Sequence, residues 1–164
     1  MILSFDVQLK VALRALNDVV APALGQAEKH VQEQLHLAIA TIGFVKTRLP
    51  DARRWYRMEL DHFVALATAA SLAVGGDEAL DGLVGEAGTA LASATADIAD
   101  YETITRHLRD AVTMLGCQCA GTAKGEALDR LVLERSGDLT PQYRQWAMPF
   151  GLEVKSDELP APAW

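Results

Sequence analysis

Two Glu-x-x-His pairs are the residues in this chain best suited to metal chemistry. The stretch "EQLH" places Glu33 three residues before His36, and "ELDH" repeats the spacing with Glu59 and His62. Three residues put a carboxylate and an imidazole on one face of a helix, one turn apart. Helical bundles that hold two iron or manganese ions use such a pair on each of two helices, with a further Glu from each of two others. A di-metal carboxylate bundle is therefore one hypothesis for this chain.

The two Glu-x-x-His pairs differ in the face of the helix on which they lie. At 100° per residue, the first pair lies at about 200° and about 140° round its helix from Val31, away from the apolar stripe. On the next helix Glu59 lies about 40° from Trp55, inside the apolar sector, and His62 lies at the edge of that sector. No third Glu-x-x-His occurs in the sequence. We therefore predict no metal and no other cofactor, with Glu59 and His62 forming a polar pair that the fold satisfies.

Three arginines near the start of a predicted helix form a candidate anion site. The stretch "DARRWYR" carries Arg53, Arg54 and Arg57 within two helical turns. Helix N-terminal amides and guanidinium groups both bind phosphate or carboxylate, so a small-molecule or anion-binding bundle is a second alternative. The competing interpretation is that these arginines pair with the excess acidic residues of a neighbouring helix.

The two cysteines do not form a recognisable metal or redox motif. Cys117 and Cys119 lie two apart in "GCQCAG", whereas a structural zinc site needs four ligands and a redox pair has the spacing Cys-x-x-Cys. Two helical residues point about 200° apart, so we predict that the two thiols are not bonded to each other.

Charge and composition exclude two classes of partner. The chain has 164 residues and a net charge of −7, whereas a nucleic-acid binder needs a basic face. The longest uncharged apolar stretch, residues 63–76, is too short for a membrane helix, which needs about 20 residues. No secretory signal is recognisable at the N-terminus. We therefore expect a cytoplasmic protein that binds neither nucleic acid nor a membrane.

Helical periodicity is nearly continuous, and no strand-like alternation is sustained. The apolar spacing, with its capping and breaking residues, predicts helices over 4–21, 27–49, 52–74, one long helix or two in line over 77–116, 123–135, and a short turn over 140–146. Pro22 and Gly25 predict a break or sharp kink after the first helix, because an unbroken helix to Arg48 would be about 67 Å long. Asp51 and Asp77 are expected N-caps.

These elements predict an all-α fold. Short loops between long helices favour antiparallel neighbours, so we expect an up-down bundle of four main helices with shorter C-terminal helices. Residues 1–150 are expected to form a single helical-bundle domain. Residues 151–164, which include "ELPAPAW", are expected to form an extended or disordered tail.

One helical segment is apolar nearly all round. In "LHLAIATIGFV", Leu37 and Phe44 lie opposite the main apolar stripe of their helix. Either a second copy of the chain or the C-terminal aromatic residues must cover them. From this face we predict a homo-oligomer, formed through Leu37 and Phe44 by a non-enzymatic interaction or accessory protein.

Overall fold

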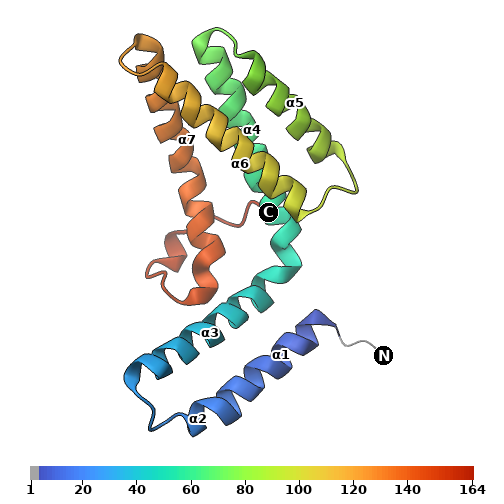
Figure 1. The fold of residues 1–164 in the computed structure, drawn as a ribbon, viewed down its shortest axis with the longest axis vertical. Helices are drawn as coiled ribbons and strands as arrows, with labels where there is room; N and C mark the ends of the chain where they lie inside the picture. The colour runs from blue at the N-terminus through green and yellow to red at the C-terminus, as the bar shows by residue number, and fades with distance from the viewer. Residues whose placement is uncertain (1–3) are drawn as a thin grey trace. The chain divides into compact units, whose positions relative to one another are not determined.

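The computed structural model describes residues 4–164, which form helices joined by turns (Figure 1). No strand occurs among these residues, so the predicted all-α class is confirmed. The chain divides into two compact units. The hairpin unit comprises the residues up to Pro50 together with Arg144–Leu159, and the bundle unit comprises Asp51–Tyr143 with Pro160–Trp164. The grouping of residues 1–150 as one domain stays a prediction.

Two antiparallel helices make up most of the hairpin unit. The first begins as α1 (Phe5–Ala15) and continues through a π-helical turn, η1 (Leu16–Val20), into the short α2 (Ala21–Ala23). It lies alongside α3 (Lys29–Arg48) (Figure 1). An ion pair of 3.7 Å between Asp6 and Lys46 joins the start of α1 to the end of α3. The first helix carries partly buried apolar side chains at helical spacing, and these face α3: Leu9, Leu13, Leu16 and Val20.

The chain reverses between α2 and α3, where the sequence predicts a break. Pro22 has no N–H to donate, and its ring crowds the carbonyl four residues back. The π-helical turn just before it relieves this crowding, because the N–H of Ala21 bonds to the carbonyl of Leu16, five residues back. The side-chain amide of Gln32 then closes the reversal by donating to the carbonyl of Ala27 at 3.0 Å.

The bundle unit is built from α4 (Ala52–Val74), α5 (Glu78–Ala92), α6 (Ile98–Gln118) and α7 (Ala123–Ala147), the last of which continues beyond the unit. The helices α4, α5 and α6 pack against one another (Figure 1). Their core contains the largest fully buried side chains of the described residues: Tyr101, Leu60, Leu80, Leu108 and Leu128. No helix within residues 4–164 has the length and apolar character that a membrane crossing needs.

The predicted bounds of the third helix, residues 52–74, are confirmed, and so is the cap of the next helix. Gly75 ends α4 in the left-handed conformation, with φ of 91°, which glycine adopts without strain. The carboxylate of Asp77 accepts a hydrogen bond of 2.8 Å from the N–H of Leu80 and so begins α5. Asp51 precedes α4, but its side chain makes no capping bond and pairs with Arg54 instead.

The segment over residues 77–116 forms two helices that pack on each other, so its prediction as one long helix or two in line is wrong. A capping box begins α6: the Asp97 carboxylate accepts from the N–H of Asp100 at 3.0 Å, and the reciprocal bond is 2.9 Å. The hydroxyl of Ser93 accepts from the N–H of Ala96 at 3.2 Å and holds the turn before it. Apolar residues keep helical spacing across this turn, so periodicity alone conceals it.

The helix α7 runs unbroken through Gly137 and Pro141, so the predicted helix end at residue 135 and the separate turn over 140–146 are wrong. Pro141 has no N–H, which leaves the carbonyl of Gly137 without its helical partner. Packing outweighs this loss, because Leu139 is buried and the Tyr143 ring meets Trp55 edge to face at 5.3 Å. Tertiary contacts of this kind commonly override local propensity.

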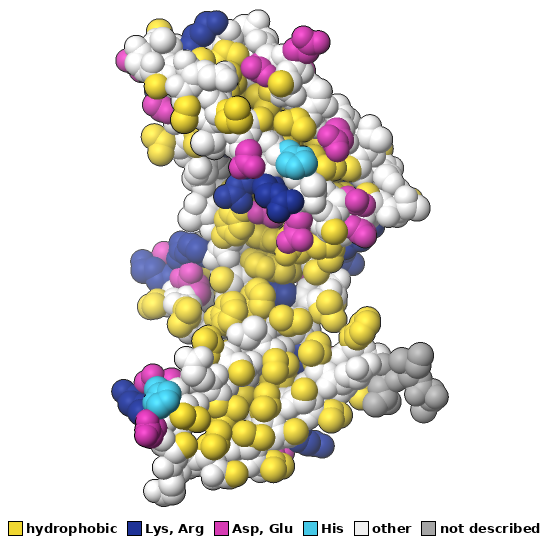
Figure 2. Space-filling view, viewed as in Figure 1, with side chains coloured by type: hydrophobic (Ala, Val, Ile, Leu, Met, Phe, Trp, Pro, Cys, Tyr) yellow, Lys and Arg dark blue, Asp and Glu magenta, His cyan; other side chains and the backbone are white. Residues whose placement is uncertain are grey.

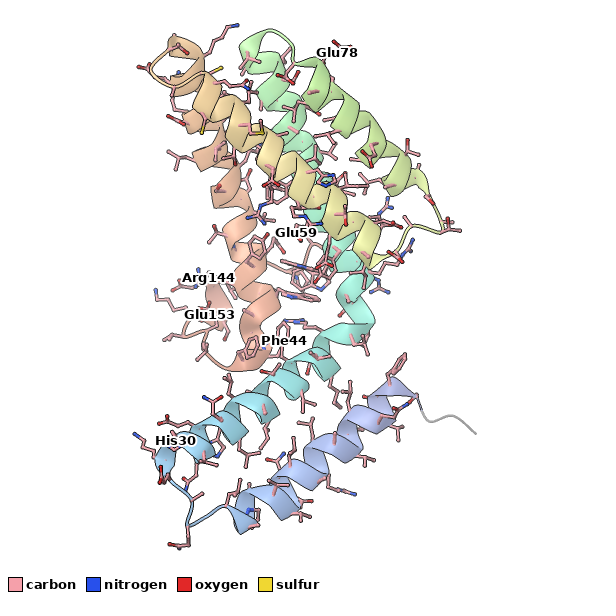
Figure 3. The ribbon with its side chains drawn as sticks, viewed as in Figure 1. His30, Phe44, Glu59, Glu78, Arg144 and Glu153 are labelled. Carbon is pink, nitrogen blue, oxygen red and sulfur yellow. The ribbon has the colours of Figure 1, made fainter. Side chains whose placement is uncertain are left out.

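Beyond α7 the chain turns back through two short 3₁₀ helices, η3 (Met148–Phe150) and η4 (Ser156–Glu158). Arg144 holds this segment with two hydrogen bonds, of 2.9 and 2.8 Å, to the carboxylate of Glu153 (Figure 3). These bonds, with two backbone N–H groups, lower the pKa of Glu153 to about 2. The pair is therefore ionised at neutral pH.

The last residues pack within the bundle unit without regular secondary structure. The indole of Trp164 meets that of Trp55 edge to face at 5.0 Å. The N–H of Ala163 donates to the side chain of Gln142 at 3.1 Å. The end of the chain is thus placed by an aromatic contact and a hydrogen bond.

Two glycines of α7 give opposite predictions for substitution by alanine. A Cβ at Gly125 would collide with the carbonyl group of Cys119, whose carbon would lie 3.0 Å away. Gly137 is exposed, and its Cβ would meet no atom within 4 Å. Gly137→Ala should therefore raise the free energy of unfolding by about 0.5–1 kcal/mol. Gly125→Ala should lower it by about 1–3 kcal/mol, because backbone atoms must shift.

Urea denaturation followed by circular dichroism measures both changes. A stabilising Gly125→Ala variant would contradict the close approach of Cys119 to α7.

Candidate functional site

The first Glu-x-x-His pair lies on the surface of α3. Glu33 and His36 are both exposed, as their phase on the helix predicts. The carboxylate of Glu33 lies 3.5 Å from the ammonium of Lys29, one turn earlier on the same helix. Exposed pairs of this kind contribute at most about 0.5 kcal/mol to stability.

The second pair is partly buried on α4, and its two members have separate partners. The carboxylate of Glu59 accepts a hydrogen bond from the hydroxyl of Tyr143 on α7. The ring of His62 packs edge to face against Phe63, with 5.5 Å between the ring centres. Within residues 4–164, no three His, Cys, Asp or Glu side chains are placed to hold a metal ion together.

The phenol groups around Glu59 are poor acids. Burial raises the pKa of Tyr143 far above its ordinary value, and Glu59 raises it further, against an opposing effect of Arg109. Burial, Glu102 and then Glu59 also raise the pKa of Tyr56. Both phenols therefore keep their protons at neutral pH and serve as hydrogen-bond donors. This arrangement fits a structural cluster better than a catalytic base.

The three candidate anion-binding arginines point to different partners. Arg53 donates to the carbonyl of Ala96 at 3.2 and 3.1 Å, and its guanidinium also reaches the carbonyl of Ala94 at 3.3 Å. Arg57 donates to a carbonyl in the last turn of α5. Arg54 pairs with Asp51 at 3.2 Å. The structure thus uses Arg53 and Arg57 to hold the turn between α5 and α6, and it does not gather the three into one pocket.

Both cysteines are free, as predicted. Cys117 is exposed near the end of α6, and Cys119 is the partly buried cap residue that follows it. Cys117 also lines a groove between α4, α6 and α7. The residues that line the groove extend from Phe63 to Ser136, which are 73 positions apart in the sequence. No local sequence pattern could therefore have predicted the groove.

The side of α3 that carries Phe44 is covered by the same chain. The Phe44 ring stacks on Phe150 at 4.4 Å and meets Trp146 edge to face at 6.1 Å. Of the two coverings considered from the sequence, the C-terminal aromatic residues are the one that reaches Phe44. Leu37 remains exposed, so only part of the predicted Leu37/Phe44 face is open.

A different apolar surface lies across α1 and α3. No side chain between Phe5 and Arg48 is buried, although both helices carry many apolar residues. Figure 2 shows apolar side chains gathered on one face of these two helices. We call this surface the hairpin face and define it by five residues: Phe5, Ala12, Val19, Ala38 and Val45.

Helical phase explains why these residues share one side. On α1, Phe5 and Ala12 lie about 40–60° to one side of Leu9, which faces α3. On α3, Ala38 and Val45 are displaced in the same rotational sense from the partly buried stripe. Because the two helices run antiparallel, equal displacements bring both sets to the same side of the hairpin.

The imidazole of His62 offers a test of the electrostatics of the bundle unit. Burial lowers its pKa, Arg135 lowers it further, and Asp138 and Asp61 oppose both effects. The pKa measured by NMR titration should therefore lie below 6.5. Arg135→Gln should raise the pKa without restoring the ordinary value, because burial is the larger cause, and Asp138→Asn should lower it.

The sign of the stability effect follows from the same shift. Between the folded and unfolded pKa values the unfolded chain binds more protons at His62, so stability falls as the pH falls through that window. His62→Gln should weaken the pH dependence of the urea midpoint between about pH 6.5 and the folded pKa. A His62 pKa above 6.5 would contradict the burial of this ring.

Comparison with known proteins adds no relative. No family model, no curated protein and no solved structure matches the chain.

Proposed function

We propose that this chain is a non-enzymatic, cytoplasmic interaction protein that self-associates through the hairpin face. The observation that carries the proposal is that no side chain between Phe5 and Arg48 is buried. In α4 alone, by contrast, seven side chains are buried: Trp55, Leu60, Leu66, Ala67, Ala70, Ser71 and Val74. Soluble monomers rarely leave a contiguous apolar face of this kind in water.

The area of the hairpin face fits a second copy of the chain. The 20 residues of α3 make it about 30 Å long. Two packed helices with axes about 10 Å apart present a face about 20 Å wide, hence about 600 Å². Two such faces would bury about 1,200 Å² together, at the lower end of the range for specific interfaces.

The absence of charge on the hairpin face also favours a copy of itself. In a two-fold pair each patch meets the same patch, so any charge on it would meet a like charge. The polar residues in its angular sector are uncharged: Gln8, Gln34 and Thr41. The ion pair of Lys10 with Asp6 at 2.6 Å lies outside that sector. Pairing two hairpins would form an intermolecular four-helix bundle.

The polar groups of the bundle unit support a non-enzymatic role. Glu59 is satisfied by Tyr143, and Arg53 and Arg57 are directed to backbone carbonyls. The two phenols with raised pKa values hold their protons at neutral pH. These groups stabilise the fold and leave no paired acid and base facing an open site.

Charge introduced on both helices of the hairpin face should separate the copies. The wild type is expected to sediment as a dimer at micromolar concentration. Val19→Glu combined with Val45→Glu would place four carboxylates in the two-fold interface. Because like charges brought together cost several kcal/mol, the dissociation constant should rise at least about 100-fold. Both side chains are exposed within one chain, so circular dichroism should show that α4, α5 and α6 remain folded.

Two control variants locate the interface. Leu72→Glu changes an equally apolar, exposed residue at the end of α4 and should leave the dimer intact. Leu37→Glu tests the other side of α3. Dissociation by Leu37→Glu, with the doubly substituted hairpin face still dimeric, would move the interface to the Leu37 side. A wild type that sediments as a monomer would refute self-association.

A further inference from the structure

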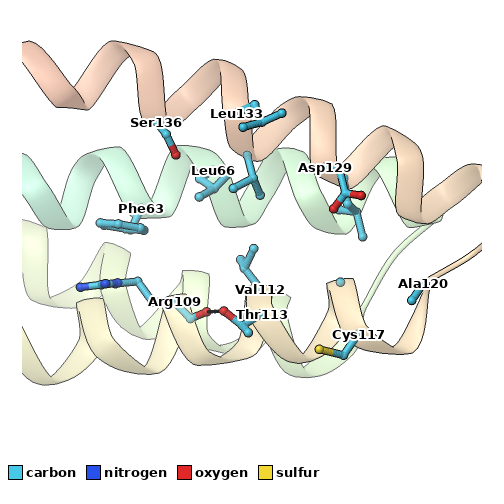
Figure 4. Close-up of a pocket in the computed structure, with 13 residues that line it drawn as sticks. Phe63, Leu66, Arg109, Val112, Thr113, Cys117, Ala120, Asp129, Leu133 and Ser136 are labelled. Carbon is cyan, nitrogen blue, oxygen red and sulfur yellow. Dashed lines mark hydrogen bonds between the residues drawn. The ribbon is translucent and has the colours of Figure 1, made fainter.

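A groove of about 810 Å³ lies between α4, α6 and α7 of the bundle unit (Figure 4). This volume falls within the range of small-molecule sites, about 300–1,000 Å³. Its walls are largely apolar and come from all three helices: Phe63, Leu66, Val112, Leu128, Val132 and Leu133. Leu133 is 73% exposed, so apolar surface is presented to whatever enters.

A cation lies at one end of the groove. The guanidinium of Arg109 lies 5.5 Å from the centre of the Phe63 ring, and Ser136 lines the same end (Figure 4). Within the described part of the chain this guanidinium makes no hydrogen bond and no ion pair. The guanidinium lies over the Phe63 ring, and its N–H donors are available to an incoming acceptor.

The opposite end of the groove carries the opposite charge. Asp129 of α7 lies there with Cys117 and Ala120, while Leu66, Val112 and Leu133 lie between the two ends (Figure 4). An apolar channel that runs from a cation to an anion selects the orientation of its ligand. An anionic headgroup is attracted to Arg109 and repelled from Asp129.

We infer that this groove binds a medium-chain aliphatic carboxylate, with its carboxylate on Arg109 and its tail along the apolar walls. A carboxylate accepts two parallel hydrogen bonds from one guanidinium. A doubly charged phosphate is less suited, because only one cation lines the groove and the chain has a net charge of −7.

The length of the groove sets the length of the tail. Arg109 and Gly116 are seven residues apart on α6, which corresponds to about 10 Å. An extended chain advances about 1.2 Å per bond, so about eight bonds span this distance. Octanoate therefore fits, and much longer tails must pass the carboxylate of Asp129.

Titration calorimetry with octanoate tests the inference on the full chain. Octanoate should bind with one site per chain, and octan-1-ol, which has the tail without the charge, should bind at least about tenfold more weakly. Arg109→Gln should weaken octanoate binding at least about tenfold. Arg106→Gln is the matched control, because it removes an exposed arginine of the same helix that does not line the groove.

Two further variants test the far end and the wall. Octanedioate should bind more weakly than octanoate because its second carboxylate meets Asp129, and Asp129→Asn should restore its binding. Leu133→Asn removes an exposed wall residue, so it should weaken octanoate binding without unfolding the bundle. With Cys119→Ser in place, bound octanoate should slow the alkylation of Cys117.

Several outcomes would overturn the inference. The absence of octanoate binding at millimolar concentration would do so, as would equal binding by wild type and Arg109→Gln. Octan-1-ol that binds as tightly as octanoate would remove the role of the carboxylate. Loss of binding in the variant with Val19→Glu and Val45→Glu would place the ligand on the hairpin face instead. Retained binding in that variant separates this site from self-association.

Discussion

The close approach of α4 to α5 and α6 is the constraint on which the described fold depends. Ala67 and Ala70 of α4 and Ala87 of α5 are fully buried, and small side chains at these positions let the helix backbones come near one another. Larger residues above and below them, such as Leu60 and Leu108, then fill the space between the helices. At the start of α4, Arg57 donates to the carbonyl of Leu91 in the last turn of α5, and Arg53 donates to the carbonyl of Ala96 just before α6.

The hairpin unit is stabilised in a different way. Its helices share one stripe of partly buried residues, and Phe44 is covered by Trp146 and Phe150. A pair of helices with a single shared stripe removes little apolar surface from water, and the hydrophobic contribution scales with that area. The stability of this unit should thus depend on protein concentration if a second copy completes it. The bundle unit has its own buried core, so its stability should not depend on protein concentration.

Local sequence signals were sufficient to predict a helix end where the residue type alone determines the backbone conformation or the cap. Gly75 ends α4 and the Asp77 carboxylate begins α5, so these bounds were predictable. They were insufficient where tertiary contacts decide. Pro141 would ordinarily end a helix, yet α7 continues because residues on both sides of it are held by packing.

The candidate sites were predictable only in part, for the same reason. The exposure of Glu33 and His36 followed from helical phase. The partner of Glu59 did not, because Tyr143 lies 84 residues away on α7. Predicting the hairpin face and the groove would have required the relative directions of the helices that form each of them. Those directions come from the turns, and the turn at Ser93 was concealed by continuous apolar spacing.

The π-helical turn makes the first helix sensitive to chain length as well as to composition. One extra residue is accommodated between Leu16 and Val20. Deleting Asn17 would restore an ordinary α-helical turn there without removing any apolar side chain. The part of the helix before the deletion would then rotate by about 100° relative to the part after it. Leu9 would turn away from α3 while Val20 stayed in place. Deleting a single residue here would therefore change which face of the first helix is exposed to solvent.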